Sequence, residues 1–242
     1  MFAALERTAA GLRRDFGEVE NLQQSIRGAS DFVAKAAARI EEMILSDLSL
    51  VRPNAGILTP NVSRDGDGRD EFVLALSGAA NFVRGIPHFA ISLALRSQDD
   101  PSSLCDAGAG TKIALIYSPI DERLYYAESG AGAFVFSAYH STRIRVSEQR
   151  EEKDLMIGYD SFETANDLKS QLSTPHSAGV SRLTGCPALD IAWVAAGKYD
   201  AFVSEPLGYA EICAGELLVA EAMGKIWEQD GKLFVTNNKI NL

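Results

Sequence analysis

The spacing of the apolar residues changes along the chain, and this change most limits the folds open to it. Residues 2–24 and 30–50 carry apolar side chains at near-helical spacing with charges between them, which predicts two amphipathic helices. From residue 72 to residue 146, short apolar runs separated by turn-forming residues are typical of strands. Strand-like runs and helical patterns then alternate. Helices, then strands, then mixed elements predict a layered fold of the α/β or α+β class.

The turn-forming residues divide the strand-rich and mixed parts into elements. The stretch from Asn54 to Asp70 is rich in Pro, Gly, Asn and Asp and reads as a loop around a short strand at 56–58. A hairpin turn is expected at 118–122, and Gly197 is expected to end a helix. The other expected strands cover residues 72–76, 89–95, 112–117, 123–127, 133–135, 143–146, 155–159, 181–183, 201–203 and a pair within 226–236, and the other expected helices cover 161–172, 186–197 and 211–223.

Composition limits the environment and the partners of this chain. Its 242 residues are 46% hydrophobic, enough for a substantial core. The formal net charge of −10 disfavours nucleic acid and anionic membranes as partners. No apolar stretch approaches the roughly 20 residues that span a bilayer, and no signal-peptide pattern opens the chain. Three scattered cysteines without a CxxC pair fit reduced thiols. We therefore expect a soluble cytoplasmic protein.

Several blocks of sequence, in order, resemble one known family. Residues 76–92 read LSGAANFVRGIPHFAIS and resemble the inositol monophosphatase signature, in which Asp-Pro-Ile/Leu-Asp-Gly-Thr-Thr-Asn-Phe precedes Gly-x-Pro-x-Phe-Ala-x-Ser. Residues 188–197 (ALDIAWVAAG) and 209–215 (YAEICAG) are similar to the family's Ala-Leu-Asp-x-Ala-x-Val-Ala-Ala-Gly helix and its Trp-Asp-x-x-Ala-Gly motif. Residues 116–119 and 127–134 match its middle strands, and residues 15–23 resemble its bacterial branch.

This resemblance implies a fold and a chemistry. The family folds as a five-layer αβαβα sandwich and usually forms homodimers. On this chain the resemblance implies one domain over residues 1–242, with an α+β lobe at about 1–148 and an α/β lobe at about 149–242. The family hydrolyses phosphate monoesters with two or three Mg²⁺ ions, which clustered carboxylates hold. Mg²⁺ prefers hard oxygen ligands, neutralises the phosphate and supplies an activated water.

The positions that match the family's site have lost most of their acids. The metal-binding Glu falls on Pro60, and the two Asp of the signature fall on Leu74 and Ser77. Leucine has no oxygen donor in its side chain, and proline offers only a backbone carbonyl. Glu211, at the Asp of the Trp-Asp motif, is the only acid left. By resemblance, the metal and catalytic positions are Ala37, Pro60, Leu74, Leu76, Ser77, Gly78, Ala79 and Glu211, and the substrate-cleft positions are Gly185, Pro187 and Ser204.

Other residues allow alternative sites. Residues 65–70 (DGDGRD) are an acidic turn that could hold a replacement metal, although no Glu follows at calcium-loop spacing. Ser77 with a histidine base is conceivable, but no Gly-x-Ser-x-Gly elbow surrounds it, and the three histidines are dispersed. A cleft without acids could also bind an anion through a basic patch. The candidates for that patch are Arg27, Lys35, Arg39, Arg84 and Lys112.

Three functions therefore stay open. The leading hypothesis is a pseudo-phosphatase, a homodimer kept for binding or regulation, with no cofactor expected. A protein partner is plausible because bacterial-branch members are implicated in contacts with the transcription machinery. The alternative is a divergent Mg²⁺-dependent phosphatase acting on inositol monophosphate or a related sugar or nucleotide phosphate, with Glu211 assisted by Asp65, Asp67 or Asp70. The third is a metal-free module that binds phosphate or a sugar phosphate.

Overall fold

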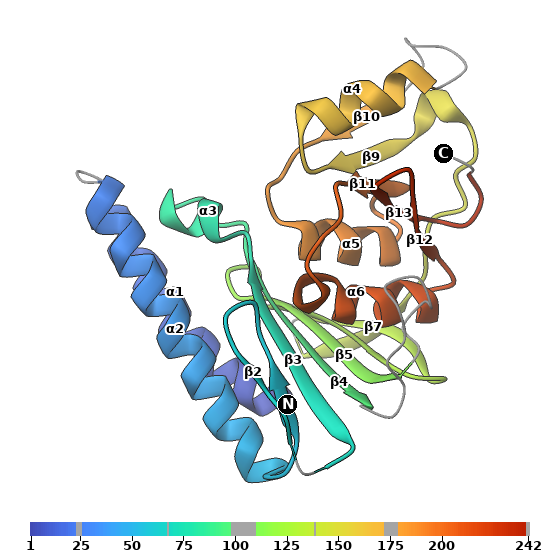
Figure 1. The fold of residues 1–242 in the computed structure, drawn as a ribbon. Helices are drawn as coiled ribbons and strands as arrows, with labels where there is room; N and C mark the ends of the chain where they lie inside the picture. The colour runs from blue at the N-terminus through green and yellow to red at the C-terminus, as the bar shows by residue number, and fades with distance from the viewer. Residues whose placement is uncertain (23–25, 67, 98–109, 138, 172–178, 241–242) are drawn as a thin grey trace.

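The fold was analysed in a computed structural model, which describes residues 1–22, 26–66, 68–97, 110–137, 139–171 and 179–240. Helices α1 (Phe2–Leu22) and α2 (Ile26–Val51) lie against one face of an eight-stranded sheet (Figure 1). Helices α5 (Pro187–Ala195) and α6 (Tyr209–Glu221) lie between this sheet and a five-stranded sheet, and α4 (Phe162–Gln171) covers the outer face of the second sheet. The order of layers is αβαβα, which confirms the expected fold class.

The two sheets differ in size and in strand direction. The large sheet has the order β2-β1-β3-β4-β5-β6-β7-β8 and is antiparallel except where β1 pairs with β3. The small sheet has the order β10-β9-β11-β13-β12, with parallel pairs on both sides of β9. The strands are β1 (Gly56–Leu58), β2 (Ser63–Arg64), β3 (Asp70–Ser77), β4 (Ala90–Ser97), β5 (Thr111–Ser118), β6 (Arg123–Glu128), β7 (Gly132–Ser137), β8 (His140–Ile144), β9 (Met156–Tyr159), β10 (Val180–Arg182), β11 (Ala201–Ser204), β12 (Lys225–Gln229) and β13 (Lys232–Thr236).

Buried apolar side chains fill the spaces between the layers. One cluster joins α1 and α2 to the large sheet through residues such as Leu12, Ile44 and Leu93. The central cluster packs α5 and α6 between the sheets, and Gly215 allows this packing because a Cβ there would come 2.7 Å from Ile191. The alternation along β3 sends Val73 to the central cluster and Leu74 to the helical side. Both faces of β3 are thus buried, as its continuous apolar run implies.

Each expected helix and strand is found, with ends that differ by a few residues, and the expected residues 23, 24 and 172 lie outside the described part. Gly197 does end a helix in the left-handed conformation, at φ +66°. The hairpin between β12 and β13 turns at Asp230 and Gly231, both with positive φ. Three short elements were not expected: β2, α3 (Ala79–Val83) and a 3-10 turn at Glu152–Asp154. None of the three is long enough to show a periodic pattern, which needs a longer window.

The turn from β3 into α3 positions the candidate site. Gly78 takes φ +82°, and a Cβ at this residue would come 2.8 Å from the carbonyl oxygen of His88. Asn81 then donates from Nδ2 to the carbonyl oxygens of His88 and Thr184, each at 2.8 Å. The side chain of Asn81 therefore connects α3 to β4 and to the loop that precedes α5.

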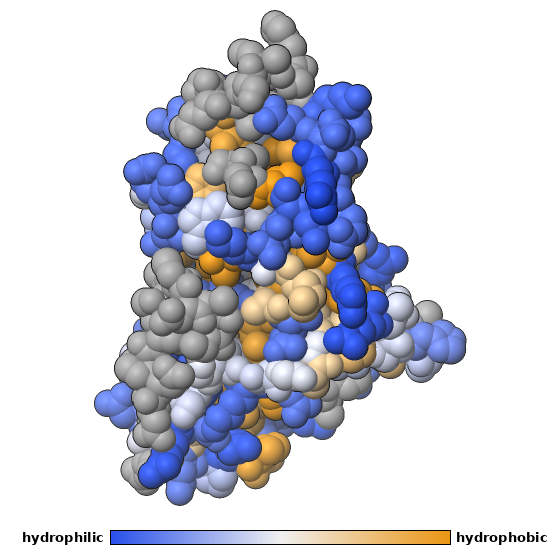
Figure 2. Space-filling view, turned by 90° about the vertical axis from the view of Figure 1, so that its right-hand side faces the viewer, coloured by the Kyte–Doolittle hydropathy of each residue, from blue (hydrophilic) through white to orange (hydrophobic). Residues whose placement is uncertain are grey.

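One face of the molecule is mainly hydrophilic. Figure 2 shows hydrophilic side chains over most of one face, with apolar areas that are small and interrupted. Within the described ranges, no helix combines the length and the apolar character needed to cross a membrane.

Candidate functional site

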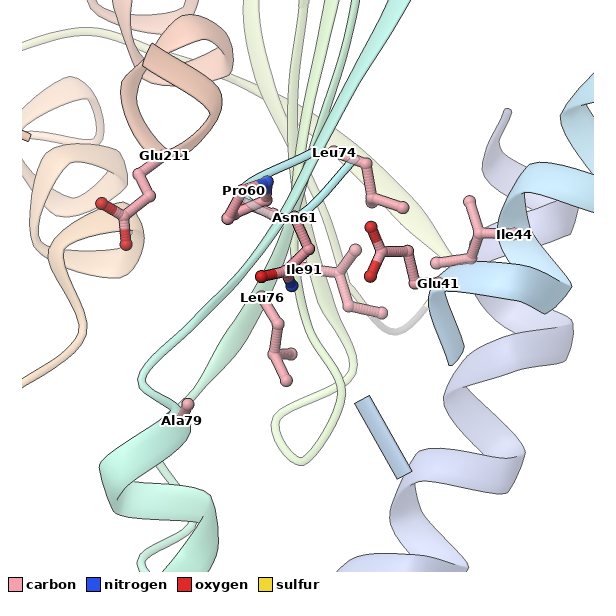
Figure 3. A pocket seen from close by; sticks show the side chains of 10 residues that line it. Glu41, Ile44, Pro60, Asn61, Leu74, Leu76, Ala79, Ile91 and Glu211 are labelled. Atoms are coloured by element: carbon pink, nitrogen blue, oxygen red, sulfur yellow. The ribbon is translucent and has the colours of Figure 1, made fainter. Parts of the chain in front are cut away.

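A cavity of about 270 Å³ lies between β3, α2, α3 and α6 (Figure 3). Helix α2 contributes Glu41 and Ile44, and α6 contributes Glu211. The turn after β1 contributes Pro60 and Asn61. The full lining is Glu41, Ile44, Pro60, Asn61, Leu74, Ala75, Leu76, Ala79, Ile91 and Glu211. Five positions selected from the sequence, Pro60, Leu74, Leu76, Ala79 and Glu211, are thus brought together around one cavity.

The floor of this cavity is aliphatic. Leu74 and Leu76 are two residues apart on β3 and therefore project from the same face of the sheet, beside Ile91 of β4 (Figure 3). Leu74 and Ile91 are buried, and both belong to the cluster that packs against α1 and α2. These side chains offer van der Waals contact to a ligand and no coordinating atom.

Ser77 does not face this cavity. Its Oγ accepts a hydrogen bond from the backbone N–H of Ala188 at 3.2 Å and lies 3.6 Å from Sγ of Cys186, with the side chain essentially buried. Ala188 is in the first turn of α5, where backbone N–H groups lack partners within the helix. The hydroxyl of Ser77 thus fastens the end of β3 to the start of α5.

The other selected positions also lie outside the lining. Gly185 has φ +73°, Pro187 is the first residue of α5, and Ser204 is buried at the end of β11. Gly78 precedes Ala79, in the turn between β3 and α3. Ala37 is in α2, and its side chain is not described.

Two carboxylates reach the cavity from different helices, on opposite sides of β3 (Figure 3). Oε2 of Glu211 accepts a hydrogen bond from the backbone N–H of Gly208 at 3.3 Å. Oε1 of Glu41 is buried, and no hydrogen-bond partner for it is found in the described part of the chain. Glu41 was not among the residues selected from the sequence. Its position four residues after Ala37, on the same face of a helix, was the signal that could have identified it.

No basic side chain lines the cavity among the described residues. Arg39 pairs with Asp15, and Lys112 pairs with Asp70 at the other end of β3. Arg84 is exposed, and the side chains of Arg27 and Lys35 are not described. The described lining is therefore acidic and mostly apolar, with Asn61 as a neutral polar residue, and it offers no positive charge to a phosphate.

The donors at the cavity do not fit a cluster of two or three magnesium ions. Pro60 and Leu74 bring no side-chain oxygen, and the hydroxyl of Ser77 is bonded to α5. Among the described residues, no group of three or more acidic, histidine or cysteine side chains could hold a metal. In the acidic turn, Asp70 is held by Arg52 and Lys112, and Asp67 lies outside the described residues. We therefore derive no reaction through magnesium.

The histidines and thiols form no catalytic pair with Ser77 in the described structure. The ring of His88 packs against Trp193, with 5.1 Å between centroids, and burial lowers the pKa of His88. His140 is exposed on β8, and His176 lies outside the described residues. Cys186 is a buried free thiol, and burial raises its pKa to about 12. Such a thiol is a poor nucleophile.

One buried acid behind the site has a shifted pKa. Burial raises the pKa of Asp190 in α5 to about 7, and a hydrogen bond from Oγ1 of Thr184 at 2.6 Å opposes part of this rise. The carbonyl of the same Thr184 accepts from Asn81. A titratable group is therefore connected, through two hydrogen bonds, to the turn that carries α3.

Comparison with known proteins agrees with this architecture. The family model described as the inositol monophosphatase family matches residues 2–241. An inositol-1-monophosphatase of Rhizobium meliloti is 34% identical over 96% of this chain and 84% of that protein. The Nus factor SuhB of Xylella fastidiosa is 28% identical over 91% of this chain and 77% of that protein. The crystal structure of the extragenic suppressor protein SuhB of Bartonella henselae is 30% identical, with a TM-score of 0.80 over 99% of this chain and 92% of that chain. Because the family model covers residues 2–241 and a relative is 34% identical over 96% of the chain, this chain belongs to the inositol monophosphatase family.

Proposed function

We propose that this protein is a pseudo-phosphatase, a family member kept for binding or regulation and catalytically impaired. The donor set at the cavity carries the proposal. The family positions for metal-binding acids are Pro60, Leu74 and Ser77, of which two have no side-chain oxygen and the third is bonded to α5. One acid, Glu211, remains at a matched position.

The electrostatics of the cavity support the same conclusion. Phosphate-monoester hydrolysis is among the slowest reactions in water, and metal ions provide most of its charge stabilisation in this family's chemistry. None of the described lining residues is a cation, so Glu41 and Glu211 oppose the approach of a phosphate dianion. Without a metal cluster, these side chains give neither charge neutralisation nor an activated water.

The alternative, a divergent magnesium-dependent phosphatase, requires acids from outside the matched motifs. Asp70 is ion-paired to Arg52 and Lys112, so recruiting it would break both pairs. Asp65 is exposed in the same turn. No observation on the described residues favours this alternative.

The proposal extends to the assembly of the protein. We propose that the protein is a cytoplasmic homodimer, as its composition and the family resemblance imply. We also propose that it binds a protein partner, because a similar protein of Xylella fastidiosa is named a Nus factor. Size-exclusion chromatography with light scattering tests the dimer. Affinity capture with purified transcription complexes tests the partner, and a protein that stays monomeric or captures none of them contradicts this extension.

The function is tested by titrating Mg²⁺ calorimetrically, with and without inositol 1-phosphate, beside a phosphate-release assay. The Rhizobium meliloti relative is the positive control. We expect neither saturable Mg²⁺ binding nor metal-dependent release from this protein. Turnover at an ordinary enzymatic rate, of order 1 s⁻¹ or more, would refute the proposal.

A further inference from the structure

The cavity has a chemistry of its own, which goes beyond the loss of metal ligands. We propose that it binds an aliphatic amine cation, with an ammonium group on Glu41 and a methylene body on the leucines of β3. A diamine, with its second ammonium group on Glu211, is the preferred ligand. This inference rests on the proposed function, because a cavity that holds magnesium and phosphate would have no room for the amine.

The walls select a ligand with an apolar body. Ile44, Leu74, Leu76 and Ile91 supply the aliphatic side chains of the lining, and Ala79 adds only a methyl group (Figure 3). Displacing water from aliphatic walls is favourable in proportion to the apolar area covered. A ligand that is polar along its whole length, such as a sugar phosphate, would leave its hydroxyl groups without partners on these walls.

Glu41 favours a ligand with a positively charged hydrogen-bond donor. Its Oε1 is buried, and it has no hydrogen-bond partner among the described residues. A buried acceptor without a donor destabilises the folded protein, and a charged acceptor does so more strongly than a neutral one. An ammonium group brings three donors and the opposite charge, so it satisfies this oxygen in a way that a neutral hydroxyl does not.

The second carboxylate favours a ligand with two charged ends. Glu211 reaches the cavity from α6, on the opposite side of β3 from Glu41 (Figure 3). Of its two oxygens, Oε2 is bonded to the backbone of Gly208. No described lysine or arginine lines the cavity to neutralise either acid. Both acids line the same cavity as the aliphatic side chains, so an aliphatic chain with an amine at each end offers one ammonium group to each acid.

The test is a calorimetric titration of the full-length protein, in the presence of a metal chelator, with 1,4-diaminobutane, n-butylamine and 1,4-butanediol. We expect the diamine to bind more tightly than the monoamine and the diol not to bind. Glu41→Gln should weaken diamine binding about tenfold or more, the usual cost of losing a charged hydrogen bond. Glu42→Gln changes the neighbouring exposed acid on α2, which lies outside the lining, and should leave the affinity unchanged.

Ala79→Leu provides a second variant that does not depend on the charge of Glu41. Ala79 is exposed at the mouth of the cavity, so a larger side chain there should block binding without disturbing the core. The inference would be overturned by absence of diamine binding, by equal binding of the diol, by diamine binding unaffected by Glu41→Gln, or by diamine binding unaffected by Ala79→Leu. Magnesium-dependent turnover would refute the proposed function instead, and the chelated titration does not depend on that result.

Discussion

The hydroxyl oxygen of Ser77 accepts a hydrogen bond from the backbone N–H of Ala188 across 3.2 Å, which joins the end of β3 to the first turn of α5. By the sequence resemblance, Ser77 matches a metal-binding Asp of the family. In this protein the side chain at that position has a structural partner in the next layer. The same position can thus stabilise the layered fold without contributing to a metal site.

This relationship predicts different outcomes for two buried serines. Ser77→Ala removes the partner of a helix N-terminal N–H, so the free energy of unfolding should fall by about 1 kcal/mol. Ser204 is equally buried, but its Oγ has no hydrogen-bond partner among the described residues, so Ser204→Ala should be neutral or stabilising. Urea denaturation followed by circular dichroism measures both. Equal losses in the two variants would contradict the role of Ser77.

Restoring the acids should restore metal binding. The triple variant Pro60→Glu, Leu74→Asp, Ser77→Asp adds three carboxylates to the one at Glu211, two of them at buried positions. Without Mg²⁺ it should melt well below the wild type because buried charges repel each other. At a Mg²⁺ concentration about a hundred times the Kd, binding should return about 2.7 kcal/mol of stability.

The matched control for this variant is Pro60→Gln, Leu74→Asn, Ser77→Asn, which has the same shapes without the charges. Its melting temperature should not respond to Mg²⁺. A melting temperature of the acidic variant that is equally indifferent to Mg²⁺ would show that the matched positions do not converge on one site.

Asp190 predicts a pH dependence of stability. Its pKa is raised from 3.8 to about 7 in the folded protein, so folding favours the protonated acid. This contribution is fully present below about pH 4 and is lost as the pH rises toward 7. Asp190→Asn keeps an acceptor for Thr184 and carries no charge. Relative to wild type, it should raise the free energy of unfolding at pH 8 by a few kcal/mol, at about 1.4 kcal/mol per pKa unit.

Thermal unfolding from pH 4 to pH 8 measures this effect. The difference between Asp190→Asn and wild type should grow with pH and level off above 7. Asp167→Asn changes an exposed acid on α4 and serves as the control for the loss of one charge. A difference that stays constant across the range would mean that the pKa of Asp190 is the same in the folded and the unfolded protein.

Asn81 should be costly to replace. Its Nδ2 bonds two carbonyl oxygens from different parts of the chain, and Asn81→Ala leaves both without this donor. We expect a loss of about 2–4 kcal/mol, because each abandoned buried acceptor costs about 1–3 kcal/mol. Asn166→Ala, at an exposed site in α4, should change stability by no more than about 0.5 kcal/mol. Chemical denaturation of the two variants compares them, and similar losses would contradict the bridging role.

Much of the fold was predictable because it depends on local spacing. The helical period of the first fifty residues, the strand-rich middle, the stop at Gly197 and the turn at Asp230-Gly231 all follow from residues close in the sequence. The short α3 was not predicted, since its start depends on Gly78 fitting under the carbonyl of His88, ten residues later.

The candidate site was likewise only partly predictable from the sequence. The sequence alone determined that residues 74 and 76 are aliphatic and that residue 211 is the only acid among the positions matched by resemblance, because residue types are read directly from it. Tertiary structure alone decided that Glu41 faces the cavity, that Ser77 is bonded to α5 and that Asp70 pairs with Lys112. The physical reason is that spacing fixes the face from which a side chain projects, whereas its partner comes from another element that packing brings to that face.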